Sequence, residues 1–144
     1  MSLNNPYLRY RQSQLETTPK LKLIVMLYDG AIRFLQQCIP PMIENRYEEK
    51  GKFINKAISI LSHLTGTLDF GNGGDLAVSL CTTYQFLTKR LVEANYHNDP
   101  EIINEVIHHL RELRGAWATV ANGLETEAPP VPAPSKRSDL SLAA

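Results

Sequence analysis

The segment Glu105-Val106-Ile107-His108 has the residue types and spacing of a metal-binding motif found in helical bundles. In di-iron bundles, two helices each supply an inward Glu-x-x-His pair and two further helices each supply an inward glutamate. The sequence holds one such pair, and on a helical wheel both residues lie on the polar side of their helix, away from Trp117. We therefore predict no metal site.

Motifs for phosphate binding and nucleophilic catalysis are also missing. The glycine-rich run GNGGD at residues 71–75 lacks the lysine and the spacing of a P-loop. Asp69 and Asp75 flank this run, where a turn or helix-capping role suits them better than acid–base catalysis. Cys38 and Cys81 form no Cys-x-x-Cys motif, and we expect both to be free thiols. The sequence thus predicts no catalytic residue, no cofactor and no enzymatic activity.

The charge balance disfavours two classes of partner. The chain has 15 basic and 15 acidic residues, a formal net charge of zero and a pI near 6.9. Nucleic acids and anionic membranes both attract a basic face, which this composition does not supply. No apolar run approaches the roughly 20 residues that span a bilayer, and no signal-peptide pattern opens the sequence. We expect a cytoplasmic protein that neither binds nucleic acid nor inserts into a membrane.

Apolar residues recur at steps of three and four, the pattern of helices that pack through one face. Four stretches show it: residues 18–39, 47–68, 75–96 and 100–123. Thr18-Pro19 has the residue types of a helix start, and Pro40-Pro41 should end the first helix. Similar lengths and short connections predict an all-α protein, an antiparallel up-down four-helix bundle over residues 18–124. The inward positions of the first helix are Leu21, Val25, Tyr28, Ile32, Leu35 and Ile39.

The two ends of the chain differ from this pattern. Residues 1–17 are mostly polar and are predicted to form a short mobile N-terminal segment that carries Tyr7 and Tyr10. Residues 125–144 are rich in Pro, Ala and Ser and cannot bury enough apolar surface to offset their ordering entropy. We expect a disordered Pro-rich C-terminal tail.

The run LIVMLYDGAIRFL, residues 23–35, is apolar almost throughout, although Asp29-Gly30 interrupts it. Asp-Gly between apolar runs is typical of a β-hairpin. The flanks do not alternate, however, and the inward face continues from Tyr28 to Ile32, so the run is predicted to be helical. Its apolar arc spans roughly 200°, about twice what a helix on the surface of a bundle needs.

The surplus apolar residues form a stripe about 140° from the inward face at 100° per residue. This apolar stripe consists of Leu23, Leu27, Gly30 and Phe34, and Ala31 lies between it and the inward face. In one interpretation the N-terminal segment covers the stripe, or the bundle is crossed so that the first helix is central. In the other, a partner helix or extended chain binds there. Both hold if Tyr7 and Tyr10 cover the stripe when the partner is absent.

Several segments occur in the order known from one protein family. They are NPY near the start, TTPKLKLIVMLYDGAI, INKAISILSHLTGTLD, GGDLAVSLCTTYQFL, LVEAN and LRELRGAW. Over about residues 4–120 the chain resembles the FliS family, the flagellin-specific export chaperones of bacteria. Pro40-Pro41 departs from the helix-friendly residues usual there.

The resemblance implies a cytoplasmic, non-enzymatic chaperone. Such a protein binds the disordered C-terminal segment of flagellin, prevents premature polymerisation and assists flagellar type III export, with components of the export apparatus as further partners. Tyr7 and Tyr10 match the segment that lies near the flagellin groove in the family. The expected partner-binding residues are Tyr7, Tyr10, Leu23, Leu27, Gly30, Ala31 and Phe34.

Two alternative functions stay open on the residues alone. One is a helical adaptor for another disordered partner, such as an anti-sigma factor or a co-chaperone. The more remote one is a metal-dependent helical-bundle enzyme, which the missing ligands disfavour.

Overall fold

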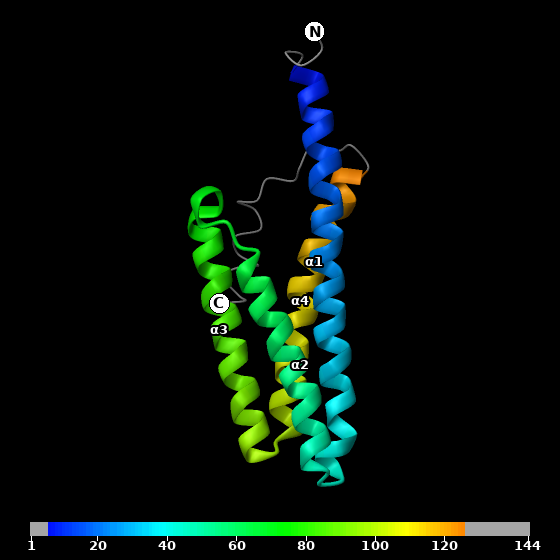
Figure 1. The fold of residues 1–144 in the computed structure, drawn as a ribbon, viewed down its shortest axis with the longest axis vertical. Coiled ribbons are helices and arrows are strands. Elements are labelled where there is room, and N and C mark those ends of the chain that lie inside the picture. The colour runs from blue at the N-terminus through cyan, green and yellow to red at the C-terminus, as the bar shows by residue number, and fades with distance from the viewer. Residues whose placement is uncertain (1–5, 126–144) are drawn as a thin grey trace.

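The computed structural model describes residues 6–125 of the 144-residue chain. Four helices follow one another: α1 (Pro6–Ile43), α2 (Tyr47–Gly66), α3 (Phe70–His97) and α4 (Pro100–Glu125). They form the predicted antiparallel up-down bundle, in which α1 and α3 each pack against both α2 and α4 (Figure 1). Helices α1 and α3 therefore stand at opposite corners, and the first turns of α1 project beyond the other helices (Figure 1).

The core follows the helical periodicity of the sequence. On α1, Tyr28 and Leu35 are fully buried, whereas Val25 and Ile39 are half-buried. Burial of one large apolar side chain contributes about 1.5–3 kcal/mol, so a continuous core of this kind stabilises the bundle. Fully buried core side chains from the other helices include Ile54, Leu61, Leu87, Leu91, Ile103 and Leu110.

Both predicted ends of the first helix were wrong. Helix α1 begins at Pro6 and not at Thr18-Pro19, and it continues through Pro40 and Pro41 to Ile43. A proline inside a helix removes one backbone hydrogen bond and crowds the carbonyl of the preceding turn, at a cost of about 3 kcal/mol or more, which other contacts must offset. Met42 is almost fully buried and Pro41 is buried, and this packing holds the last turn in place.

The glycine-rich run between the second and third helices is not a simple turn. Residues from Phe70 onward already form the first turn of α3, and the Asp69 carboxylate caps it by accepting a hydrogen bond from the backbone N–H of Asn72 at 3.1 Å. Gly74 then interrupts the helix at φ 52° and ψ −129°, a conformation that glycine adopts and other residues avoid. The capping role of Asp69 is confirmed. The long part of α3 begins at Asp75, after the break at Gly74, as predicted, and the short helical turn from Phe70 was not predicted.

A buried lysine fastens the end of the bundle that holds the α1–α2 and α3–α4 connections. Lys50 Nζ donates hydrogen bonds to the carbonyl oxygen of Asn95 at 2.7 Å and to Asn98 Oδ1 at 3.0 Å. Asn98 Nδ2 in turn donates to the carbonyl oxygen of Met42 at 3.0 Å. This network links α1, α2 and the end of α3, and we call this end of the molecule the Lys50 end.

The predictions of a mobile N-terminal segment and of a disordered C-terminal tail fall partly outside the described residues. The tail from residue 126 and the first five residues lie outside the described range. The side chains of Tyr7 and Tyr10 are also outside it, although both residues belong to α1.

Candidate functional site

The Asp29-Gly30 pair places two different contacts on two sides of α1. Arg114 of α4 donates two hydrogen bonds to the Asp29 carboxylate, from Nε at 2.9 Å and from Nη2 at 3.4 Å. On another side, Gly30 faces α2, where a Cβ atom added to it would lie 3.3 Å from Cδ1 of Ile60. The glycine therefore lets α1 and α2 approach closely, and the aspartate ties α1 to α4.

The half of the apolar stripe that contains Gly30 and Phe34, here called the lower half, packs against α2. The rings of Phe34 and Phe53 stack with centroids 6.4 Å apart and an interplanar angle of 30°. The ammonium nitrogen of Lys56 lies 5.3 Å from the Phe34 ring centroid and 5.9 Å from that of Phe53, within the range of cation–π attraction. The protein's own second helix thus covers part of the apolar surplus.

The other half of the stripe, which contains Leu23 and Leu27 and is here called the upper half, is not fully covered by the helices of the bundle. The Leu23 side chain is 52% exposed, and Leu27, one turn further on, is half-buried against the core. Met26 is 65% exposed and lies three residues after Leu23, so the two side chains are neighbours on the helix surface. Sequence reasoning did not include Met26, although its spacing from Leu23 and Gly30 placed it at the edge of the stripe.

The remaining predicted residues have different positions. Ala31 is fully buried in the core and Gly30 is buried against α2, so neither offers an exposed side chain to a partner. Tyr7 and Tyr10 lie in the part of α1 whose side chains are outside the described residues. The structure therefore brings the stripe residues together on one face of α1, with Leu23 as its exposed member.

Residues that could have formed a metal site are engaged otherwise. The Glu105 carboxylate forms an ion pair with Arg90 at 2.8 Å, and hydrogen bonds from this guanidinium hold the pKa of the carboxyl below its usual value. His108 lies 3.4 Å from Glu112, on the solvent side of α4. Among the described residues, no three His, Cys, Asp or Glu side chains are grouped so that they could hold a metal ion.

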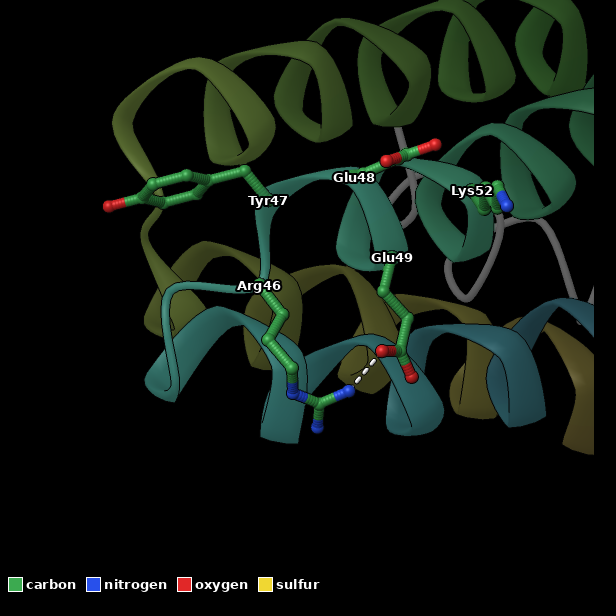
Figure 2. Close-up of a pocket in the computed structure, with 5 residues that line it drawn as sticks. All are labelled: Arg46, Tyr47, Glu48, Glu49 and Lys52. Atoms are coloured by element: carbon green, nitrogen blue, oxygen red, sulfur yellow. Dashed lines mark hydrogen bonds and ion pairs between the residues drawn. The ribbon is translucent and has the colours of Figure 1, made fainter.

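An open pocket beside the α1–α2 connection is lined by Arg46, Tyr47, Glu48, Glu49 and Lys52 (Figure 2). Figure 2 shows Tyr47 pointing away from the acidic side chains, and Arg46 turned toward Glu49. Arg46 forms ion pairs with Glu49 and with Glu44, so its charge is satisfied inside the chain. The positive and negative side chains that line the pocket largely offset one another. The pocket is therefore a weaker candidate than the stripe for binding an apolar partner.

No helix in the described range 6–125 combines the length and apolar character needed to cross a bilayer. Among the described residues, the exposed apolar side chains of Leu23 and Met26 on α1 form the best-defined candidate surface for binding a partner.

Comparison with known proteins places the chain among flagellar proteins. The family model described as flagellar protein FliS matches residues 3–124. The flagellar secretion chaperone FliS of Vibrio cholerae is 35% identical over 105 residues, covering 73% of this chain and 77% of that protein. The chaperone of the same name from Bacillus subtilis is 31% identical over 117 residues, covering 81% and 86%. That of Campylobacter jejuni is 34% identical over 122 residues, covering 85% and 95%.

Proposed function

The chain belongs to the FliS family of flagellar proteins, and from this membership we propose that it acts as a flagellar secretion chaperone, as its named relatives do. This is a family of chaperones, so the chain is not an enzyme. More specifically, the chain binds the disordered C-terminal segment of flagellin in the cytoplasm. It thereby prevents premature polymerisation and assists type III export, in contact with components of the export apparatus.

The observation that carries this proposal is the exposed apolar pair Leu23 and Met26 on α1. Further along the helix, α2 covers the same face of α1 at Gly30 and Phe34. A partner helix laid along the upper half would continue the packing that α2 provides below. Recognition of an apolar helix face by a helical groove is a common mode of peptide binding.

The partner's chemistry fits this surface. The end of an unpolymerised flagellin exposes apolar residues that later pack in the filament, so a chaperone needs an apolar surface and no catalytic groups. A segment that folds on binding loses conformational entropy, which must be offset by a long contact area. Helix α1, with 38 residues, is about 57 Å long at 1.5 Å per residue and supplies that length.

Within this proposal the predicted residues have separate roles. Leu23 and Leu27 contact the partner, together with Met26, whereas Phe34 packs on α2 and supports the end of this surface. Tyr7 and Tyr10 lie further up α1 and extend the contact toward its start. Gly30 and Ala31 act indirectly, because they set how closely α2 approaches the stripe.

Co-purification with flagellin tests the proposal directly. The full-length chain is expected to retain full-length flagellin and to lose flagellin that lacks its C-terminal segment. Equal retention of both forms would place the binding site elsewhere on flagellin. Retention of neither would favour a helical adaptor for another disordered partner.

A further inference from the structure

A separate apolar pocket, with a volume of about 140 Å³, lies at the end of the bundle opposite the Lys50 end. Its walls come from α1, α3, α4 and the connection between α2 and α3. The apolar side chains that enclose it are those of Ile24, Leu68, Leu76, Leu80, Tyr84 and Trp117. Of the stripe residues, neither Leu23 nor Leu27 lines it, and Gly30 and Phe34 face α2 instead.

The polar atoms in the walls are already occupied within the protein. The Asp69 carboxylate accepts hydrogen bonds from the backbone N–H and the side-chain amide of Asn72, at 3.1 and 2.8 Å. The Thr67 hydroxyl donates to the carbonyl oxygen of Leu64 at 2.6 Å. The Tyr84 hydroxyl is hydrogen-bonded to Tyr28. A polar ligand would find no free partner among these groups, so the pocket suits an apolar group.

The volume restricts that group to one side chain. Cavities of about 150 Å³ lined by apolar residues hold a molecule of the size of benzene, whereas sites for drug-sized ligands begin at about 300 Å³. The pocket therefore has room for one leucine, methionine or phenylalanine side chain and is too small for a cofactor or for a turn of helix.

The pocket lies beside the open half of the apolar stripe. Ile24, which lines it, directly follows the exposed Leu23 on α1. Leu27 is three residues after Ile24 and four after Leu23, so the three side chains are neighbours on the helix surface. A chain bound along Leu23 and Leu27 therefore passes next to the pocket, within reach of a single side chain. One wall is also closely packed around glycine, because a Cβ atom on Gly73 would lie 3.0 Å from the Cβ of Ala77.

We propose that this pocket is an anchor socket, which receives one bulky aliphatic or aromatic side chain of the flagellin segment bound at the stripe. The inference rests on the proposed function, and it adds the element that fixes the register of the partner. An apolar stripe alone allows a helix to slide along it, whereas one side chain seated in a pocket holds a single position. Anchors of this kind, desolvated in a fitted pocket, dominate the energetics of many interfaces.

Filling the pocket from within provides the test. Ala77→Leu places three additional carbon atoms into the space from a buried wall position. Val78→Leu is the matched control, because it enlarges the next residue of α3, which is 55% exposed and does not line the pocket. A second filling variant, Leu76→Phe, enters from another wall position and serves if Ala77→Leu does not fold as judged by circular dichroism.

The measurement is a calorimetric titration of each full-length protein with a synthetic peptide of the C-terminal segment of the same organism's flagellin. Wild type and Val78→Leu should bind with the same affinity, and the filled variants at least tenfold more weakly, since a fully buried Leu or Phe contributes more than the 1.4 kcal/mol that equals tenfold. Trp117 is the one tryptophan of the chain and lines the pocket, so its emission should shift on binding in wild type and not in the filled variants.

The outcomes separate this inference from the function on which it rests. If all the folded variants bind the peptide equally, the pocket is not a socket and the proposed function stands. If the peptide binds none of the proteins, wild type included, the proposed function fails and the socket fails with it. If the filled variants alone lose affinity, the anchor is established.

Discussion

The hydroxyl oxygens of Tyr28 and Tyr84 lie 2.5 Å apart in the centre of the bundle, where both side chains are buried. Tyr28 belongs to α1 and Tyr84 to α3, which occupy opposite corners and make no direct backbone packing contact in the described residues. One hydroxyl donates and the other accepts, so each satisfies a buried polar group of the other helix. The hydrogen bond therefore ties together the two helices that the backbone packing leaves apart.

Replacing both of these tyrosines should cost less stability than the sum of the losses caused by replacing each one alone. Tyr28→Phe or Tyr84→Phe alone leaves the other hydroxyl buried without this partner, at a cost of about 1–3 kcal/mol in the free energy of unfolding. The double variant removes both polar groups and should lose clearly less than the sum of the single losses. Urea unfolding of the four proteins measures this coupling. Strict additivity would show that the two hydroxyls do not depend on each other.

Alkaline pH should destabilise the protein through the same pair. Burial raises the pKa of both Tyr28 and Tyr84 above the ordinary tyrosine value, and it raises the pKa of the Cys38 thiol to about 12. Above about pH 9 for the thiol and about pH 10 for the phenols, the unfolded chain loses protons that the folded chain keeps, so the free energy of unfolding falls as pH rises. Below these values the stabilisation is fully present.

Variants identify which groups cause this loss. The fall in stability between neutral and alkaline pH should be smaller in the Tyr28→Phe/Tyr84→Phe double variant, and smaller in Cys38→Ala, than in wild type. Burial lowers the pKa of Lys50, which acts in the opposite direction, and the nearby Cys38 partly counteracts that shift, so Cys38→Ala also changes the Lys50 contribution. Unfolding measured by denaturant at a series of pH values gives the comparison. Identical pH profiles would assign the alkaline loss to other groups.

The contact between Gly30 and α2 should tolerate one added carbon atom and not three. A Cβ at this position would lie 3.3 Å from the flexible end of the Ile60 side chain, which must shift slightly. Gly30→Ala gains up to about 1 kcal/mol of helix propensity and should be near neutral, whereas Gly30→Val should cost about 1–3 kcal/mol by overpacking. Gly115 of α4 has open space around it, so the same pair of changes there should differ far less. Thermal unfolding distinguishes the two sites.

Charges on the open half of the stripe should impair flagellin binding without unfolding the chain. Leu23→Asp and Met26→Asp alter exposed side chains, so the bundle stays folded, but a bound partner must then desolvate an unpaired carboxylate. Binding of the flagellin peptide should weaken at least tenfold, which corresponds to about 1.4 kcal/mol. Circular dichroism and calorimetric titration provide the two measurements.

Two controls frame this result. Val92→Asp places the same charge on an exposed apolar residue of α3 and should leave binding unchanged. Leu35→Asp places it in the core and should unfold the protein. If Leu23→Asp and Met26→Asp bind like wild type, the partner uses another face of the bundle.

Lys50 should be needed for the stability of its end of the bundle. Lys50→Met keeps the length of the side chain but leaves the carbonyl of Asn95 and the side chain of Asn98 without their donor. A fully buried acceptor left unsatisfied costs about 1–3 kcal/mol, and these two are partly buried, so the loss should lie at the lower end of that range for each. Lys52→Met, two residues away and exposed, is the matched control and should have little effect. Equal midpoints of thermal unfolding for the two variants would contradict this role.

What the sequence by itself determined is the number of helices and the residues that face inward. These depend on local periodicity, and Tyr28 and Leu35 are buried where that periodicity places them. The ends of the first helix could not be read from it, because proline favours a helix start and disfavours a helix interior, and only tertiary packing can outweigh that local preference. Packing of Met42 and Pro41 against the rest of the protein decided where that helix ends.

The candidate site was only partly predictable for a related reason. A helical wheel showed that α1 has more apolar surface than one core face needs, but it does not say which neighbour covers which part. The tertiary structure divided the stripe, with Phe34 stacked on Phe53 below and Leu23 and Met26 open above. The pocket beside Trp117 and the Tyr28–Tyr84 hydrogen bond join residues that lie far apart in the chain. Such contacts depend on how the helices pack in space, which local residue patterns do not encode.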